Sequence, residues 1–289
     1  MVLVTLLWSM AGVVTRHLDA ARSFEVTFWR SAFNGLALAV GLSVLRGPSL
    51  WRGLARASSV VWISAVCWAV MFTAFMVALT LTSVANVLVT MAMAPMVTAL
   101  FSRFFLGQRL PRRTWLAIFA AGIGIGWMFG REAQQGGSLL GSLVACAVPL
   151  AGAINLTVLQ RVSQARQQNP GCGPDMLSAV LLGALLSAAA TLPLATPFQA
   201  SHHDLAWLAL LGMAQLAVPC LLMVRASREL PAPEIALLAL LEVIFGVLWA
   251  WLGAGEQPST GVVFGGGLVL LALVANEAPA LLKIRRGVR

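Results

Sequence analysis

Residues 235–254 read IALLALLEVIFGVLWAWLGA, a run of twenty residues whose only charge is Glu242. At a rise of about 1.5 Å per residue, a helix of this length crosses the hydrocarbon core of a bilayer, which is about 30 Å thick. A charged side chain near the centre of such a helix costs about 3 kcal/mol on insertion scales. The stretch therefore predicts a transmembrane helix whose carboxylate faces other helices and a polar path, not lipid.

The composition of the whole chain carries the same signal. Of its 289 residues, 60% are hydrophobic and 10% are charged, whereas soluble domains carry about 25% charged residues. Too few polar side chains are present to cover a water-facing surface, so an integral membrane protein is expected. The net charge of +9 lies in short connectors between apolar runs, which favours membrane topology over nucleic-acid binding.

Charges, prolines and glycines divide the chain into ten apolar stretches that predict transmembrane helices. These stretches lie near residues 1–15, 24–45, 59–79, 84–106, 112–129, 138–160, 174–195, 204–224, 233–254 and 259–277. The first stretch is short, and the third and fourth are separated only by the small polar link LTSVA. Nine helices is therefore the alternative count.

Basic residues are distributed unevenly between the connectors. Alternate connectors, together with the tail from residue 278, hold fifteen basic residues, and the other set holds only Arg16, Arg22 and Arg131. The richer side is expected to be cytoplasmic, so both termini are expected there too. Nearly all basic residues are Arg, which suggests G+C-rich codons, and we expect a multi-pass protein of the bacterial inner membrane.

The two halves of the chain repeat each other. ALTLTSV at 78–84 aligns with ASRELPA at 226–232, an offset of 148 residues that also pairs Gly107-Gln108 with Gly255-Glu256. Because each half has five spans, the second copy enters the membrane from the opposite side. The copies are then related by a pseudo-two-fold axis in the membrane plane, an arrangement typical of transporters.

These observations together predict the fold class. We expect an all-α integral membrane protein with ten transmembrane helices, arranged as two inverted five-helix repeats around a central cavity. The first repeat covers residues 1–130 and the second covers residues 138–282. Rocking of one repeat against the other would give alternating access to a substrate near the membrane midplane.

Three features resemble a known family: LLWSMAG at 6–12, the single Arg30 in the second span, and ALTLTSVANVLVTMAMAPMVTALFSRFFLGQRL at 78–110. They are similar to the EamA branch of the drug/metabolite transporter superfamily, and residues 226–256 repeat the pattern in the second half. The resemblance implies a ten-helix inner-membrane transporter, often an exporter of amino acids or related metabolites. The LWS of the first span resembles the aromatic amino-acid exporters of that family.

Glu242 and Arg30 are the leading candidates for a substrate site. Glu242 could pair a substrate cation or take up a proton, or it could be a neutral carboxyl that bonds a neighbouring helix. Arg30 could clamp a substrate carboxylate with its guanidinium fork. It could equally snorkel to the periplasmic surface or pair with Glu25. An amino acid needs partners at both ends, so Arg30 and Glu242 would form a coherent pair.

Other polar, aromatic and thioether side chains inside the spans are further candidates for the cavity wall. Stacking on indoles, hydrogen bonding and soft contacts are the interactions they offer, and helix packing is the alternative for each. The substrate-binding candidates of this kind are Trp8, Trp68, Trp249, Asn86, Thr90, Met91 and Asn155. Asn34 is a further hydrogen-bonding candidate. Trp51, near a span end, is expected to be an interfacial anchor.

Two prolines and several glycines have expected mechanical roles. Pro95 and Pro149 lie inside spans, where each removes a backbone hydrogen bond, so we predict hinge or gating positions. The family pattern Leu-Glu-Pro, by contrast, ends in Val243 in the second half. Gly122, Gly126 and Gly130 recur at four-residue spacing, and GVVFGGG at 261–267 repeats the device. Such faces predict close packing of spans five and ten.

Other classes of protein fit the sequence less well. No HExxH motif, intramembrane aspartate pair or P-loop is present, so we expect no enzyme, no metal site and no cofactor. Rings of charge typical of a channel filter are also missing. The expected function is export of small metabolites, above all aromatic or other apolar amino acids, by a monomer in the lipid bilayer. A multidrug or lipid translocase on the same fold is the alternative.

Overall fold

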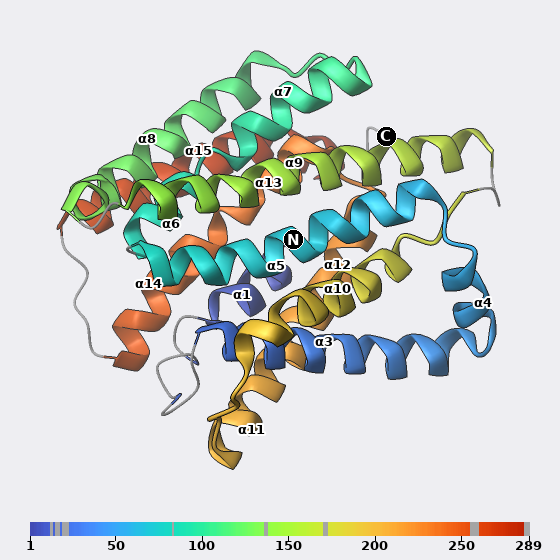
Figure 1. Ribbon diagram of the computed structural model, residues 1–289. Coiled ribbons are helices and arrows are strands. Elements are labelled where there is room, and N and C mark those ends of the chain that lie inside the picture. Colours follow the sequence, from blue (N-terminus) through green and yellow to red (C-terminus); the bar gives the residue numbers. More distant parts are fainter. Residues whose placement is uncertain are drawn as a thin grey trace.

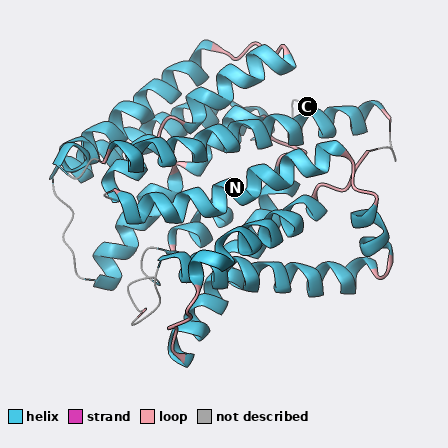
Figure 2. Ribbon diagram, viewed as in Figure 1, coloured by secondary structure: helices cyan, strands magenta, loops and turns pink. Residues whose placement is uncertain are grey.

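The computed structural model describes residues 1–11, 14, 18, 23–82, 84–135, 138–169, 173–254 and 260–285. All regular structure in these ranges is helical (Figure 1, Figure 2). Eight of the described helical stretches are long and apolar enough to cross a bilayer. The chain is therefore a multi-pass, all-helical membrane protein. Two further apolar segments, α1 (Val2–Ser9) and Thr260–Asn276 at the start of the last helix, are shorter.

The helices of each half follow the predicted stretches closely. After α1, the first half contains α3 (Ser23–Arg46), α4 (Ser49–Ala55), α5 (Ser59–Leu81), α6 (Val84–Met91), α7 (Ala94–Leu106) and α8 (Arg112–Gln135). The second half contains α9 (Leu139–Gln168), α10 (Leu177–Ala195), α11 (His202–Leu210), the π-helix η1 (Leu211–Ala217), α12 (Val218–Ala226), α13 (Ala232–Ala239), α14 (Leu241–Ala254) and α15 (Thr260–Arg285).

Two differences from the predicted helices have physical causes. Helix α9 continues about two turns beyond residue 160, because nothing in RVSQARQQ breaks a helix and its polar side chains project beyond the apolar span. The short α4 lies in the connector between the second and third predicted stretches. Its Leu50 is buried in the core, which ties this amphipathic turn to the bundle.

Both penultimate spans are broken, and the breaks correspond. Helix α6 ends at Met91 and α7 begins at Ala94, while α13 ends at Ala239 and α14 begins at Leu241. Pro95 explains the first break, because it sits in the first turn of α7 and has no amide hydrogen. The second break occurs without a proline. There, the backbone amides of Leu240 and Val243 donate hydrogen bonds to carbonyls three residues earlier, in place of four.

Proline does not interrupt the other span in which a hinge was predicted. Pro149 lies inside α9, which remains helical from Leu139 to Gln168. The helix is continuous on both sides of this proline. Within the described residues, Pro95 is therefore the only one of the two predicted hinges that lies beside a helix interruption.

Helices from the two halves interleave throughout the bundle. In Figure 1, the long α9 runs beside α5, and α3 lies beside α10 at the opposite edge. Helices α8 and α15 pack along each other and cover a second core formed with α13 and α14. The larger core joins α3, α5, α9, α10, α12 and α13 around Trp68 and Phe72.

The predicted packing of spans five and ten is confirmed, but the glycine at the contact on span five is a different one. A Cβ atom on Gly265 would lie 2.4 Å from the Gly124 carbonyl oxygen, and one on Gly124 would lie 2.7 Å from the Gly265 carbonyl oxygen. Gly122, Gly126 and Gly130 face open space. The four-residue repeat was therefore assigned to the wrong face of the helix, because Gly122 and Gly124 point about 200° apart.

Candidate substrate-binding site

Arg30 lies in the interior of the bundle, one third of the way along α3. Its side chain is 5% exposed, and its Nη1 donates a hydrogen bond to the Met76 sulfur on α5 at 3.1 Å. The prediction that it snorkels to the surface is therefore wrong. A guanidinium held by a thioether is weakly compensated, because sulfur is a poor acceptor and carries no formal charge.

Glu25 is not the partner of Arg30. Its carboxylate accepts hydrogen bonds from the backbone amides of Gln199 and Ala200, the shortest at 2.8 Å, and from the Trp29 indole at 3.4 Å. Glu25 thus holds the segment before α11 against the start of α3. The alternative that Arg30 pairs with it is excluded by these contacts.

Glu242 is the charged group that faces Arg30. It lies in the first turn of α14, directly after the helix break, and the charges of the two side chains interact. Among the described residues, no hydrogen bond to the carboxylate is formed. The positive end of the α14 dipole favours a negative charge at this position. Two opposite charges that lie 212 positions apart in sequence thus lie near enough inside the bundle for their charges to interact.

Helix α1 completes this region with Trp8 and Ser9. Cys220 on α12 lies near the Trp8 indole and near the charges of Arg30 and Glu242. Trp249 lies two turns after Glu242 on the same face of α14, and its Nε1 donates to Ser9 Oγ at 3.0 Å. Both indoles are half-buried. The arrangement brings together four predicted residues: Arg30, Glu242, Trp8 and Trp249.

Two buried amides near Arg30 have free hydrogen-bonding groups. Asn34, one turn after Arg30, is fully buried, and neither its oxygen nor its nitrogen has a partner among the described residues. Gln215 in η1 donates to the Trp8 carbonyl at 3.0 Å, but its own Oε1 has no partner there. Gly212 brings η1 against the backbone of Arg30 and Asn34, so these groups lie in one neighbourhood.

The remaining predicted residues bind helices to each other. Asn155 on α9 accepts a hydrogen bond from Ser64 on α5 at 2.6 Å, about 18 Å along α5 from Met76. Trp68 is buried in the larger core and stacks obliquely on Phe72. For these two predicted residues the contacts are those of the packing alternative.

Helix α6 carries three more predicted residues. Asn86 donates to Ser142 on α9 at 2.7 Å and to Thr82 at 2.9 Å, and Met91 packs in a small cluster with Val87 and Ala145. These two join α6 to α9, as the helix-packing alternative predicts. Thr90 donates to the Asn86 carbonyl at 2.8 Å, within α6 itself.

Sequence reasoning missed four members of the region around Arg30: Met76, Ser9, Gln215 and Cys220. Gln215 had a usable signal, because it is the one amide in an otherwise apolar stretch at 204–224. Met76, Ser9 and Cys220 had none. Their types occur throughout the spans, and only the folded arrangement distinguishes them.

The charges, indoles and free amides of this region suit a small ligand with opposite charges and an apolar body. A guanidinium binds a carboxylate, a carboxylate binds an ammonium group, and indole faces bind apolar or aromatic groups. Free amide groups on Asn34 and Gln215 offer further hydrogen bonds.

Comparisons with known proteins agree with this architecture. A solved crystal structure of a protein with 19% sequence identity has a TM-score of 0.78 and covers 96% of this chain and 95% of its own, so the two share a fold. No curated protein matches the chain. The model of the EamA-like transporter family matches residues 1–130 and again residues 139–276. The chain therefore belongs to the EamA-like transporter family, whose members are membrane transporters of small solutes.

Proposed function

We propose that this protein is a secondary transporter that exports small metabolites, above all amino acids with aromatic or other apolar side chains. The observation that carries the proposal is that the charges of Arg30 and Glu242 lie near enough to interact inside the bundle. Burying two charges is costly unless they have a use, and charged residues inside membrane spans commonly mark substrate or proton pathways.

The chemistry of the region selects the substrate class. Arg30 would bind the α-carboxylate, and Glu242 would bind the α-ammonium group or exchange a proton when the site is empty. Trp8 and Trp249 would contact the side chain of the substrate. An unpaired buried amide costs about 1–3 kcal/mol, so polar atoms of the substrate bonding to Asn34 and Gln215 would remove that penalty.

Two repeats in inverted orientation, with ten helices in all, would provide alternating access around this site. Exchanging the halves preserves several helix contacts: α5 meets α9 as α12 meets α1, and α7 meets α9 as α14 meets α1. The pairs α3 with α10 and α8 with α15 map onto themselves. The two helix breaks also follow the 148-residue offset of the sequence repeat.

The proposal also includes the membrane that holds the protein and the orientation of the chain in it. The connectors rich in arginine would face the cytoplasm of a bacterium, so both termini would be cytoplasmic and export would run toward the periplasm. One chain contains both repeats and the whole site, which supports a functional monomer.

Proteoliposomes that contain the purified protein would test the proposal. We would measure uptake of labelled phenylalanine, methionine, lysine and glutamate, with and without an imposed proton gradient. Saturable uptake of phenylalanine or methionine that unlabelled analogues inhibit is the expected result. If no amino acid moves although the protein is folded, drugs or lipids become the substrates and the assigned role of Arg30 is wrong.

A further inference from the structure

A pocket of about 770 Å³ lies at the end of α3, away from the substrate site. Its walls are the end of α3, the whole of α4, the start of α5 and the segment that leads into α10. The Arg46-Gly47-Pro48 sequence shapes it, because Gly47 ends α3 at a positive φ of 59° and proline cannot continue the helix. The chain then turns back into α4.

The charge of this pocket is strongly unbalanced. Three guanidinium groups line it, from Arg46, Arg52 and Arg56, against the single carboxylate of Asp175. Arg166 and Arg228 lie near enough to Arg46 to repel it. The pocket therefore has an excess of positive charge that no described side chain neutralises.

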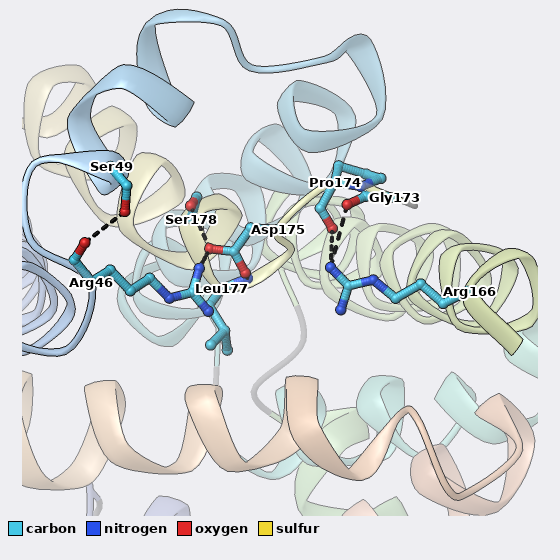
Figure 3. A network of polar contacts seen from close by, with 8 residues as sticks. All are labelled: Arg46, Ser49, Arg166, Gly173, Pro174, Asp175, Leu177 and Ser178. Atoms are coloured by element: carbon cyan, nitrogen blue, oxygen red, sulfur yellow. Dashed lines mark hydrogen bonds and ion pairs between the residues drawn. The ribbon is translucent and has the colours of Figure 1, made fainter. Parts of the chain in front are cut away.

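The Asp175 carboxylate already forms an ion pair and hydrogen bonds within the protein. As Figure 3 shows, it forms an ion pair with Arg46 and accepts hydrogen bonds from the Ser178 hydroxyl at 2.9 Å and the Leu177 amide at 3.3 Å. Arg166 donates to the carbonyls of Gly173 and Pro174, which fixes the wall on this side. Arg52 and Arg56 are exposed and have no such partner among the described residues. The site is thus held open with two free guanidinium groups.

The surroundings identify which anion would reach these groups. Leu36, Val40 and Val44 follow one face of α3 at four-residue spacing, and each is more than half exposed, which marks a lipid-facing stripe. The stripe ends two residues before Arg46. Trp51 on α4 is also half exposed, as expected for a side chain at the headgroup level. A lipid whose acyl chain lies on this stripe would have its phosphate at about the membrane depth of the pocket.

We propose that this pocket binds the phosphate of an anionic phospholipid headgroup, with Arg52 and Arg56 as the binding residues and Arg46 as their support. Bidentate contacts from guanidinium groups to phosphate oxygens would hold the headgroup. The bound lipid would brace α3, α4 and α10 against each other at the membrane surface. This inference does not depend on which substrate the protein carries.

Native mass spectrometry of the full chain in neutral detergent, titrated with phosphatidylglycerol, would test the proposal. Each arginine near an anionic lipid surface is worth about 1 kcal/mol. We therefore expect Arg52→Gln/Arg56→Gln to weaken lipid binding about 30-fold. Arg103→Gln/Arg113→Gln, which removes two exposed arginines outside the pocket, is the matched control and should change the affinity less than two-fold. Equal losses in both double variants would overturn the proposal.

Two further measurements separate the remaining outcomes. Gly53 lines the pocket with open space around its Cβ position, so Gly53→Glu adds a carboxylate without a clash and should weaken binding as strongly. Unchanged binding in Gly53→Glu would contradict the assigned site. If inorganic phosphate at millimolar concentration displaces phosphatidylglycerol completely, or if phosphatidylcholine binds equally well, an anionic lipid is not the ligand.

Discussion

Replacing Gly265 with alanine provides a quantitative test of the contact between α8 and α15. The added Cβ would lie 2.4 Å from the Gly124 carbonyl oxygen and 2.5 Å from Met128 Cγ. Carbon atoms in contact are separated by about 3.5–4.0 Å, so the two helices must move apart by about 1 Å. Overpacking of this kind costs about 1–3 kcal/mol. At about 3 °C per kcal/mol, the unfolding midpoint should fall by about 3–9 °C.

Gly122→Ala is the matched control for this measurement, because nothing lies within 4 Å of its Cβ position. Alanine there should leave the stability unchanged or raise it by up to about 1 kcal/mol, since alanine favours helix over glycine. Thermal unfolding of both purified variants in the same detergent, followed by circular dichroism, makes the comparison. If Gly265→Ala and Gly122→Ala unfold at the same temperature, the close approach of these helices does not contribute to stability.

Three further predictions concern the interior polar residues. Glu242→Gln should lower saturable transport at least ten-fold in proteoliposomes while membrane insertion is retained; unchanged kinetics would remove its functional role. Arg30→Lys keeps the charge but loses the planar fork, so the KM for a carboxylate substrate should rise about ten-fold with little change in KM for uncharged analogues. Gln160 accepts the amide hydrogen of Ala232 at 2.9 Å in a buried setting. Gln160→Leu should therefore lower the free energy of unfolding by about 1–3 kcal/mol, which thermal unfolding of the purified variant would measure.

The helical spans could be predicted from sequence because a bilayer imposes a minimum length of apolar chain. The stretch at 59–79, for example, corresponds to α5 at Ser59–Leu81. The break in α13–α14 could not be predicted, because no proline or glycine lies within five residues of Leu240. Hydropathy reports which chain segments enter the membrane and not where their backbone hydrogen bonds are interrupted.

The candidate site was only partly predictable for a related reason. Arg30 and Glu242 were conspicuous because charges are expensive inside a bilayer, and that cost is local to each residue. Asn86 and Asn155 carry the same kind of signal at lower cost, yet they bond to Ser142 and Ser64 on neighbouring helices. Which polar group faces a partner helix depends on long-range packing, and a single sequence does not encode that in any local pattern.

The break at Leu240 would act as a hinge for α14, and this hinge lies beside the charged pair Arg30 and Glu242. Helix α14 is fourteen residues long, so a bend of about 10° at the break would displace its far end by about 4 Å. Glu242 lies two residues, or about 3 Å, from the break and would hardly move. Trp249, about 12 Å along α14 from the break, would move by about 2 Å, enough to break its 3.0 Å hydrogen bond to Ser9. The carboxylate could thus stay with Arg30 while the indole beside it opens and closes.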